Sequence, residues 1–223
     1  MSPVPDVIAY RIRRSRRARR VRVAVDPTTG VEVVLPQRAA AHEAEAAVAE
    51  LRPWIERRLR EIERVRAVIA GRAGTLPYLD QTLTLVTQPG RTRVHRRGEQ
   101  LLVPDGDERL PALERFYRRA AQREISARLD HACAQTGTSY ERLSIRGQRS
   151  RWASCSRSGT MSFNWRLMMA PEEVLDYVVW HEVCHLEVMD HSDEFWRLVS
   201  RRCPGYRRHI RWLREHGPTL VLE

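Results

Sequence analysis

The sequence predicts an α+β protein, and three patterns along its 223 residues support this fold class. Valines that alternate with other residues near the N-terminus indicate strands, since side chains two positions apart share one face of a sheet. Apolar residues spaced three and four apart over 40–70 and 111–136 indicate amphipathic helices. A further helix, leading into residue 185, follows a strand–turn–strand pattern. The chain has no internal repeat, and we expect helices packed beside small antiparallel sheets.

The N-terminal segment, residues 7–36, is expected to form β-structure. Valines alternate over 21–25 and again over 31–35, and Asp-Pro-Thr-Thr-Gly at 26–30 has turn chemistry. Residues 40–70 then have helical spacing, which Pro53 interrupts because proline lacks the backbone donor that a helix interior needs. We expect one kinked helix, or two helices with Pro53 opening the second.

The middle of the chain contains short strand patterns. Leu83 and Leu85, then 91–95, then 101–103 are separated by glycine-containing turns. A loop at 105–107 follows, and we place the domain boundary there. The expected organisation is an N-terminal β-hairpin, helix and β region over 1–104 and a catalytic domain over 105–223, or one continuous domain.

The C-terminal half begins with a long amphipathic helix over 111–136 that Gly137 ends. A short strand is expected at 143–145, followed by strand, Ser-Gly turn and strand over 151–167. These strands directly precede the helix with the histidines, so we expect one of them to border a cleft. After a break at Pro204-Gly205, a last helix runs to residue 217.

The composition is strongly basic. The net charge is +11, and all 39 basic residues are arginines, eight of them between Arg11 and Arg22. This run has two explanations: a surface for nucleic acid or another polyanion, or the solvated face of an edge strand, which arginine protects against aggregation. The exclusion of lysine is attributed to codon bias.

Cysteine usage and hydropathy favour a cytoplasmic protein. Cys133, Cys155, Cys184 and Cys203 form no C-x-x-C pair and no small secreted framework, so free thiols are expected. The N-terminus has no apolar stretch typical of a signal peptide, and no segment approaches the ~20 apolar residues of a membrane span.

The most informative stretch is His181-Glu182-Val183-Cys184-His185. Residues four apart on a helix lie on one face, with Cβ atoms roughly 5–6 Å apart, so two imidazoles at this spacing can bind one metal ion. Apolar positions from Val174 onward have helical periodicity, as the motif requires. Glu182 lies beside the metal position, where a carboxylate can take a proton from an activated water. Cys184 has the wrong phase for a ligand and is assigned to packing.

A third ligand is expected from His191. In an unbroken helix His191 would be rotated by about 600° from His185 and lie roughly 9 Å further along the axis. The helix must therefore end between them, and Asp190 could supply the reversal because it tolerates left-handed geometry. Ser192 then caps a new helix whose first turn is acidic. Three side chains are rival oxygen ligands that we assign to solvent or capping: Glu187, Asp190 and Glu194.

Three histidines and one open position are typical of a catalytic zinc site, whereas structural zinc sites have four protein ligands. One Zn²⁺ is therefore the expected cofactor, although three imidazoles also suit other divalent metals. Hydrolysis also needs hydrogen-bond donors for the negative charge that develops in the transition state, and nearby residues that could donate to it or to the substrate are Asn164, Tyr177 and Arg166. Each of these three also has an ordinary structural explanation.

These residues together resemble the YgjP-like family, which belongs to the wider WLM/SprT-like group of zincin metallopeptidases. The resemblance is dense from about 111 to 216 and weaker before it, and Ala153 and Asp80 stand where the family commonly has glycine. The matching residues are Arg151-Trp152-Ala153-Ser154-Cys155-Ser156, Phe163-Asn164-Trp165-Arg166-Leu167, Ala170-Pro171, Asp176-Tyr177-Val178-Val179, His181 to Leu186, His191-Ser192 and Phe195-Trp196.

The resemblance implies a zincin-like catalytic half in which His181, His185 and His191 bind zinc and Glu182 is the catalytic base. It implies less about the substrate, since relatives in the wider group act on proteins and the closer family is linked to nucleotide phosphoanhydrides. The leading hypothesis is a zinc-dependent peptidase acting on a protein or peptide. The alternatives are a nucleoside triphosphate pyrophosphatase and a nucleic-acid-binding module with structural zinc.

Overall fold

The computed structural model describes residues 7–148 and 151–222. Residues 1–6, the start of the segment searched for a signal peptide, lie outside the described residues. Contacts within the chain divide it into two compact units, Met1–Gly71 and Arg72–Glu223. This division differs from the boundary expected at 104/105, because residues 75–103 contribute Leu76, Leu83 and Leu101 to the core of the second unit.

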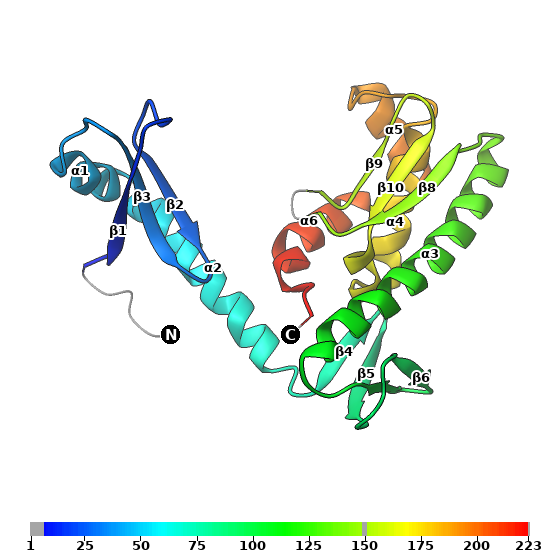
Figure 1. Ribbon diagram of the computed structural model, residues 1–223. Coiled ribbons are helices and arrows are strands. Elements are labelled where there is room, and N and C mark those ends of the chain that lie inside the picture. The colour runs from blue at the N-terminus through cyan, green and yellow to red at the C-terminus, as the bar shows by residue number, and fades with distance from the viewer. Residues whose placement is uncertain (1–6, 149–150, 223) are drawn as a thin grey trace. The chain divides into compact units, whose positions relative to one another are not determined.

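Over residues 7–71 the first unit is a three-stranded sheet with two helices (Figure 1). The strand order is β1-β3-β2, with β1 parallel and β2 antiparallel to the central strand. Pro53 lies in the first turn of the second helix, so the alternative of two helices is the observed one. The elements are β1 (Tyr10–Ser15), β2 (Arg22–Asp26), β3 (Gly30–Pro36), α1 (His42–Glu50) and α2 (Arg52–Ala70).

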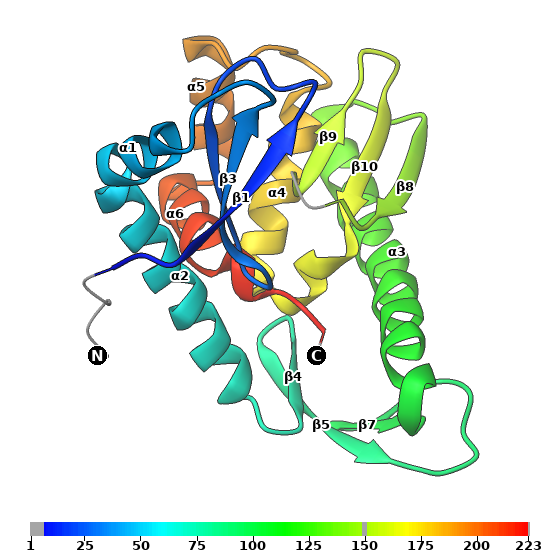
Figure 2. The same ribbon diagram turned by 60° about the vertical axis from the view of Figure 1, so that its left-hand side comes forward.

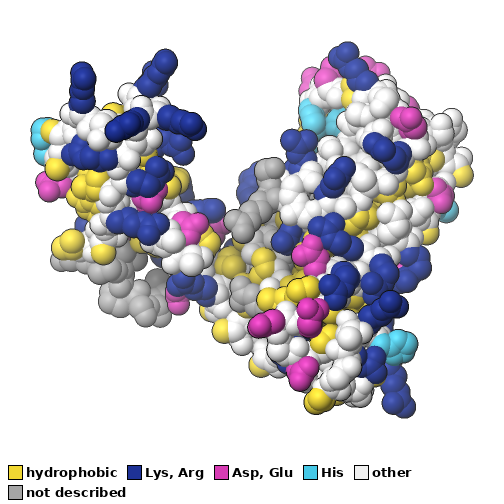
Figure 3. All heavy atoms as spheres, in the orientation of Figure 1, with side chains coloured by type: hydrophobic (Ala, Val, Ile, Leu, Met, Phe, Trp, Pro, Cys, Tyr) yellow, Lys and Arg dark blue, Asp and Glu magenta, His cyan; other side chains and the backbone are white. Residues whose placement is uncertain are grey.

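The first unit has its own core and a basic edge. Val33, Leu35 and Ile55 are fully buried, because β3 is the central strand and the helices supply apolar side chains to it. The arginine run lies on β1, an edge strand, and on the connection to β2, where Arg16, Arg17, Arg19 and Arg20 are exposed. Arginine side chains stand out from this unit in Figure 3.

Within residues 72–148 and 151–222, the second unit contains two sheets and four α-helices, and Figure 1 labels the helices. Gly137 ends the long helix as predicted, with φ of 67°. The α-helices are α3 (Arg109–Thr136), α4 (Glu172–Cys184), α5 (Asp193–Arg202) and α6 (Tyr206–His216). The strands are β4 (Thr75–Tyr78), β5 (Gln81–Thr87), β6 (His95–Arg97), β7 (Gln100–Val103), β8 (Arg142–Arg146), β9 (Ala153–Cys155) and β10 (Thr160–Asn164). Short 3₁₀ helices are η1 (Gly106–Glu108), η2 (Trp165–Met169) and η3 (Gly217–Thr219).

The small sheet beside the histidine helix has the order β8-β10-β9 and is mixed. β9 pairs antiparallel with β10, as the strand–turn–strand pattern predicts, but β8 pairs parallel with β10. The expectation of an antiparallel sheet is therefore wrong for β8, because the chain passes from β8 through β9 before it enters β10, and no tight turn joins β8 to its neighbour in the sheet. The predicted second strand also ends early, and residues 165–169 form η2 instead.

The other sheet, of order β4-β5-β7-β6, packs on the N-terminal part of α3. Its strand β4 was not predicted as a strand, since Pro77 lies in it and proline disfavours interior strands. β4 is an edge strand, where a missing donor is tolerated. Two hydrogen bonds connect it to the rest of the unit: Tyr117 Oη donates to the Pro77 carbonyl at 2.6 Å, and Leu79 N donates to the Met168 carbonyl at 2.7 Å.

The long helix α3 supports α4, which lies beside it in both ribbon views (Figures 1 and 2). Leu175, Val179 and Val183 of α4 are at most 2% exposed, so the helix is held by apolar packing. Arg128 of α3 adds a polar connection: it donates to Glu124 on its own helix and to Glu172 and Asp176 of α4. Its Nε lies 2.8 Å from Asp176 Oδ1.

None of the helices within residues 7–148 and 151–222 combines the length and the apolar character that crossing a bilayer would require.

Gly137→Ala is expected to destabilise the second unit by about 1 kcal/mol, because an L side chain disfavours the left-handed conformation of this helix end. A methyl group there would meet no atom within 4 Å, so the effect comes from the backbone alone. Urea unfolding followed by circular dichroism measures the change. Gly137→Asn is the control and should lose less, since asparagine tolerates this geometry; equal stability of Gly137→Ala and wild type would contradict the prediction.

Candidate metal centre

The histidine pair lies on the last two turns of α4 and at its end. Pro171 precedes the helix with φ of −55°, and Glu172 and Glu173 form its acidic first turn, where negative side chains are favoured. The apolar face of α4 is buried, and His181 faces α5, where its ring meets Phe195 and Trp196. The strand β9 also contacts α4. His185 is the residue at the C-terminal end of the helix.

Three imidazoles converge. One ring nitrogen from each of His181, His185 and His191 lies within 4.8 Å of the other two. His181 Nε2 and His191 Nε2 are 3.2 Å apart. The His185 Nδ1 lies 3.1 Å from the Val188 carbonyl, which accepts its proton and leaves Nε2 for a metal. Among the described residues this is the group of potential ligands that could hold a metal ion.

Phe195 of α5 packs against all three rings. Its ring stacks on His185 with centroids 4.3 Å apart and meets His181 and His191 edge-on at 4.9 Å each. Because Phe195 is fully buried, it limits the rotation of these imidazoles. Trp196 contacts His191 from the same helix, with ring centroids 5.7 Å apart.

The turn between His185 and His191 is built differently from the expectation. The helix ends between the two histidines as predicted, but Asp190 is not among the described non-glycine residues with positive φ. Its carboxylate instead accepts a hydrogen bond from Ser192 N at 3.0 Å, an Asx-type turn. Ser192 is the residue before α5, and no side-chain hydrogen bond caps the helix. The reversal therefore comes from side-chain hydrogen bonding and not from a left-handed residue.

Burial controls the ionisation of this cluster. It lowers the pKa of His181 to about 3, helped by the neighbouring His185 and His191, so this imidazole stays neutral and able to bind a metal. Burial also lowers the pKa of His185. The same effect raises the pKa of Glu182 to about 8, opposed by the positive charge of Arg151.

The residues present fit a divalent zinc ion. Three neutral imidazoles are a donor set that zinc prefers in catalytic sites. Glu182 is 4% exposed, and its Oε2 has no hydrogen-bond partner among the described residues. A buried carboxylate oxygen without a donor is costly, and a nearby cation with a water molecule would satisfy it.

The three candidate substrate contacts lie in different places. The Tyr177 hydroxyl lies 3.5 Å from His181 Nδ1 and is nearly buried. Asn164 donates from Nδ2 to the Gln148 carbonyl at 2.7 Å, and its Oδ1 accepts from Arg166 N. Arg166 places its guanidinium over the Trp165 ring and donates to the Gly147 carbonyl. Tyr177 is therefore the candidate that contacts the histidine cluster directly.

None of the three rival ligands, Glu187, Asp190 and Glu194, belongs to the group of potential metal ligands found among the described residues, and two of them have other partners. Glu187 accepts from Arg202, and Asp190 is held by Ser192 N. Cys184 is fully buried, consistent with its assignment to packing. The four cysteines are free thiols in the structure, as expected.

Three contributors to the site were not identified from the sequence. Phe195 was assigned only to an apolar helix face, and the Val188 carbonyl belongs to the backbone, which side-chain patterns do not reveal. Arg151 acts on Glu182 through charge alone. The edge strand β9 contacts α4, which agrees with a strand bordering the site.

Comparison with known families decides what kind of protein this is. The sequence profile of the YgjP-like, metallopeptidase domain family matches residues 19–216, most of the chain. The chain belongs to the YgjP-like metallopeptidase family. The resemblance noted from the motifs is thereby confirmed, and the helices and small sheets described above confirm the α+β fold class. A metallopeptidase family and a three-histidine cluster together support a zinc hydrolase.

Two solved structures are similar to parts of the chain. The metallopeptidase zymogen abylysin of Pyrococcus abyssi is 26% identical and matches 44% of this chain and 99% of its own, with a TM-score of 0.38. The metallopeptidase zymogen jannalysin of Methanocaldococcus jannaschii is 19% identical and matches 39% and 92%, with a TM-score of 0.34. At these TM-scores neither likeness adds to the YgjP-like assignment. No curated protein matches the chain.

Glu182→Gln is expected to change how the stability of the metal-free protein depends on pH. Glu182 binds its proton more tightly when folded, with a pKa of about 8 against an ordinary value of 4.5, so ionisation opposes folding. The wild type should therefore lose stability relative to Glu182→Gln as pH rises from about 4.5 to 8. The shifted histidines are common to both proteins and cancel in the difference.

Thermal unfolding of both proteins in chelator at pH 5, 6, 7 and 8 measures this. The melting temperature of Glu182→Gln minus that of wild type should increase with pH. A difference that stays constant or decreases would show that Glu182 is not buried as an uncompensated acid.

Proposed function

We propose that this YgjP-like protein is a zinc-dependent peptidase in which His181, His185 and His191 bind one zinc ion and Glu182 is the general base. The observation that supports this most is the pairing of a three-imidazole cluster with a buried carboxylate that has an oxygen without a donor. A closed structural site would need a fourth ligand and no base.

Each residue has a role in this mechanism. When bound, zinc supplies Lewis acidity, which makes a water molecule more acidic and polarises a carbonyl. Glu182 accepts the proton of the attacking water and later delivers it to the departing amine. Glu182 suits this role by its position, since it follows His181 directly on α4 and has a buried carboxyl oxygen without a donor among the described residues.

The surrounding residues orient the imidazoles. With Nε2 as the ligand atom, Nδ1 of His181 carries the proton and can donate it to the Tyr177 hydroxyl. In the same way, Nδ1 of His185 donates its proton to the Val188 carbonyl, which leaves Nε2 of His185 as the ligand atom. We therefore assign Tyr177 an orienting role, whereas Asn164 and Arg166 are engaged in hydrogen bonds to the backbone and are weaker candidates for contact with the substrate.

The zinc assignment predicts one zinc per chain in wild type and in Glu182→Gln, measured by elemental analysis after dialysis. His191→Ala should lose most of the metal, because two imidazoles hold zinc much less tightly than three. His131→Ala is the matched control, since His131 is exposed and outside the cluster. Equal zinc content in both alanine variants would remove His191 from the ligand set.

Substitution of the base predicts a loss of activity without a loss of metal. Glu182→Gln should retain zinc and cleave an unfolded protein substrate on the order of 10²–10⁴-fold more slowly, the usual contribution of a general base. Nucleoside triphosphates are assayed in parallel. If wild type cleaves triphosphates but not protein, and Glu182→Gln loses that cleavage, the phosphoanhydride alternative is favoured. A Glu182→Gln variant as active as wild type would contradict both the peptidase and the phosphoanhydride hypothesis.

We further propose weak polyanion binding by the arginine run of the first unit. Arg11 and Arg13 pair with Glu32, but Arg16, Arg17, Arg19 and Arg20 are exposed and form no ion pair among the described residues. Closely spaced guanidinium groups of this kind neutralise phosphates and release counterions. This binding would add to the peptidase activity and would not require zinc.

Replacing Arg16, Arg17, Arg19 and Arg20 by glutamine should weaken binding to single-stranded DNA. In a plot of the logarithm of the binding constant against the logarithm of the salt concentration, the slope should become shallower. The change should be about one unit for each phosphate that the variant no longer neutralises. A variant with the same charge change at exposed arginines of the second unit is the control: Arg119, Arg201, Arg211 and Arg214. Equal weakening in both variants would show that net charge, and not this run, governs binding.

A further inference from the structure

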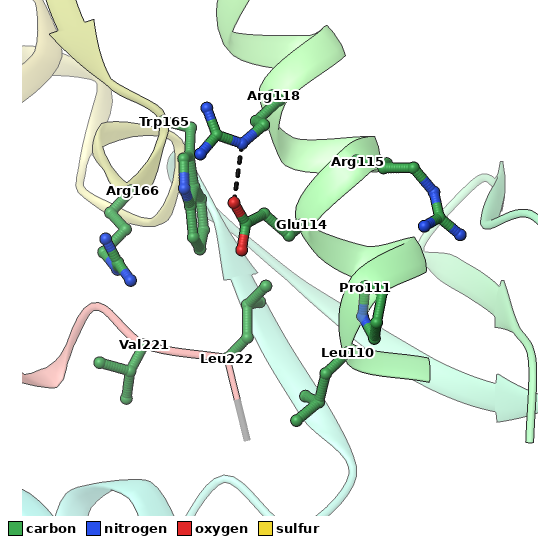
Figure 4. A pocket seen from close by; sticks show the side chains of 9 residues that line it. All are labelled: Leu110, Pro111, Glu114, Arg115, Arg118, Trp165, Arg166, Val221 and Leu222. Carbon is green, nitrogen blue, oxygen red and sulfur yellow. Dashed lines mark hydrogen bonds and ion pairs between the residues drawn. The ribbon is translucent and has the colours of Figure 1, made fainter. Parts of the chain in front are cut away.

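A cavity of about 620 Å³ in the second unit lies apart from the metal centre (Figure 4). None of the three histidines or Glu182 is among its lining residues. Each charged side chain that lines it already has a partner: Arg115 pairs with Glu108, Arg118 with Glu114, and Arg166 donates to the Gly147 carbonyl. The buried polar side chain that bears on the metal centre lies elsewhere, on α6.

His209 of α6 occupies a position where an apolar residue would be expected. It is 3% exposed and lies on the same face of the helix as Leu213, four residues later, which is also buried. Burying a polar ring costs free energy that a leucine would not cost. The presence of an imidazole at this position therefore needs an explanation other than filling the core.

The ring of His209 stacks against Tyr177 of the metal-binding helix. The two ring centroids are 5.9 Å apart and the planes make an angle of 20°, which is an offset stack. The helices α6 and α4 contact each other and lie side by side in both ribbon views (Figures 1 and 2). Because Tyr177 is only 6% exposed, a flat ring packed beside it restricts how its own ring can turn.

The position of the Tyr177 ring matters because its hydroxyl lies 3.5 Å from His181 Nδ1. The two rings meet at a steep angle of 67°, with centroids 5.9 Å apart. A distance of 3.5 Å is near the upper limit for a hydrogen bond, so a small displacement of the tyrosine ring would break this contact. When His181 binds a metal through Nε2, its Nδ1 carries a proton that needs an acceptor, and the acceptor fixes the orientation of the imidazole.

Arg208 holds the His209 ring from its edge. Arg208 Nε donates to His209 Nε2 at 3.3 Å, and its Nη2 donates to Glu173 of α4 at 2.7 Å. Burial lowers the pKa of His209, which favours the neutral ring that this hydrogen bond requires. The imidazole is thus fixed at its edge by Arg208 and at its face by Tyr177.

We propose that His209 is a positioning residue for the metal centre: its ring holds Tyr177 where the tyrosine hydroxyl accepts the Nδ1 proton of His181, and it thereby strengthens zinc binding. This proposal rests on the zinc site of the proposed function. It does not depend on the substrate, because its measurable consequence is the zinc affinity of the protein.

Two substitutions at His209 separate stacking from filling of the core. His209→Phe keeps a flat ring against Tyr177, whereas His209→Leu keeps apolar bulk without a ring. The zinc dissociation constant of the full-length protein is measured by competition with a chelator. His209→Leu should bind zinc about tenfold more weakly than wild type, a usual effect of removing a residue that supports a metal ligand. His209→Phe should stay within about twofold of wild type, because the stack remains.

A double-mutant cycle tests whether Tyr177 transmits the effect. Tyr177→Phe removes the acceptor and should itself weaken zinc binding about tenfold. In this background His209→Leu should cause no further loss beyond about twofold, since two residues that act through one contact are not additive.

A second pair of variants leaves the core intact. Arg208→Gln removes the hydrogen bond to His209 from an exposed side chain and should weaken zinc binding about threefold. Arg211→Gln makes the same charge change on an exposed side chain nearly one turn further along α6 and should have little effect.

Three results would overturn the proposal while the zinc site stands: equal zinc affinity of His209→Leu and wild type, equal weakening by the leucine and phenylalanine variants, or a full further loss in the Tyr177→Phe background. If the His209 variants do not fold, equal affinity of Arg208→Gln and Arg211→Gln would overturn it. Failure of the proposed function has a different signature, because wild type would then bind no zinc or His191→Ala would bind it as tightly as wild type. The positioning role of His209 would be overturned together with it.

Discussion

The apolar packing of α4 against α3 is the constraint on which the candidate metal centre depends. Val174, Leu175, Val178, Val179 and Val183 are nearly or fully buried, so the helix cannot rotate without exposing this face. Fixed in this way, α4 holds His181 and Glu182 in a poorly solvated place. The neutral imidazoles and the protonated carboxyl follow from that burial, and the cation that fits the site would offset its cost.

The position of the third histidine, His191, depends on the turn that follows α4. The Asx turn at Asp190 directs His191 back toward His181, and Phe195 of the next helix packs against all three rings. The imidazoles are thus held by apolar contacts as well as by the Val188 carbonyl and the Tyr177 hydroxyl. Such supporting contacts set the orientation and basicity of metal ligands as much as the ligands themselves do.

Sequence patterns predicted the features that local chemistry determines. Helical periodicity, Pro53 and Gly137 identified the helices, and spacing identified the histidines. Long-range pairing was not accessible: β8 pairs in parallel with β10 across the intervening turn and β9, and β4 joins a sheet that the sequence patterns group with the N-terminal half. The prediction of a left-handed residue at Asp190 was wrong, because the chain reverses there through a hydrogen bond from Ser192 N to the Asp190 carboxylate. The contacts of Phe195 depend on tertiary packing, which periodicity does not encode.

The central claim is that the metal is held by imidazoles alone. X-ray absorption at the zinc edge of the zinc-loaded protein tests it most directly, because nitrogen and sulfur ligands differ in distance by about 0.2–0.3 Å. Three nitrogen donors at about 2.0–2.1 Å, with the scattering pattern of imidazole rings, are the expected result. Sulfur at about 2.3 Å, from Cys184 or Cys155, would contradict the claim.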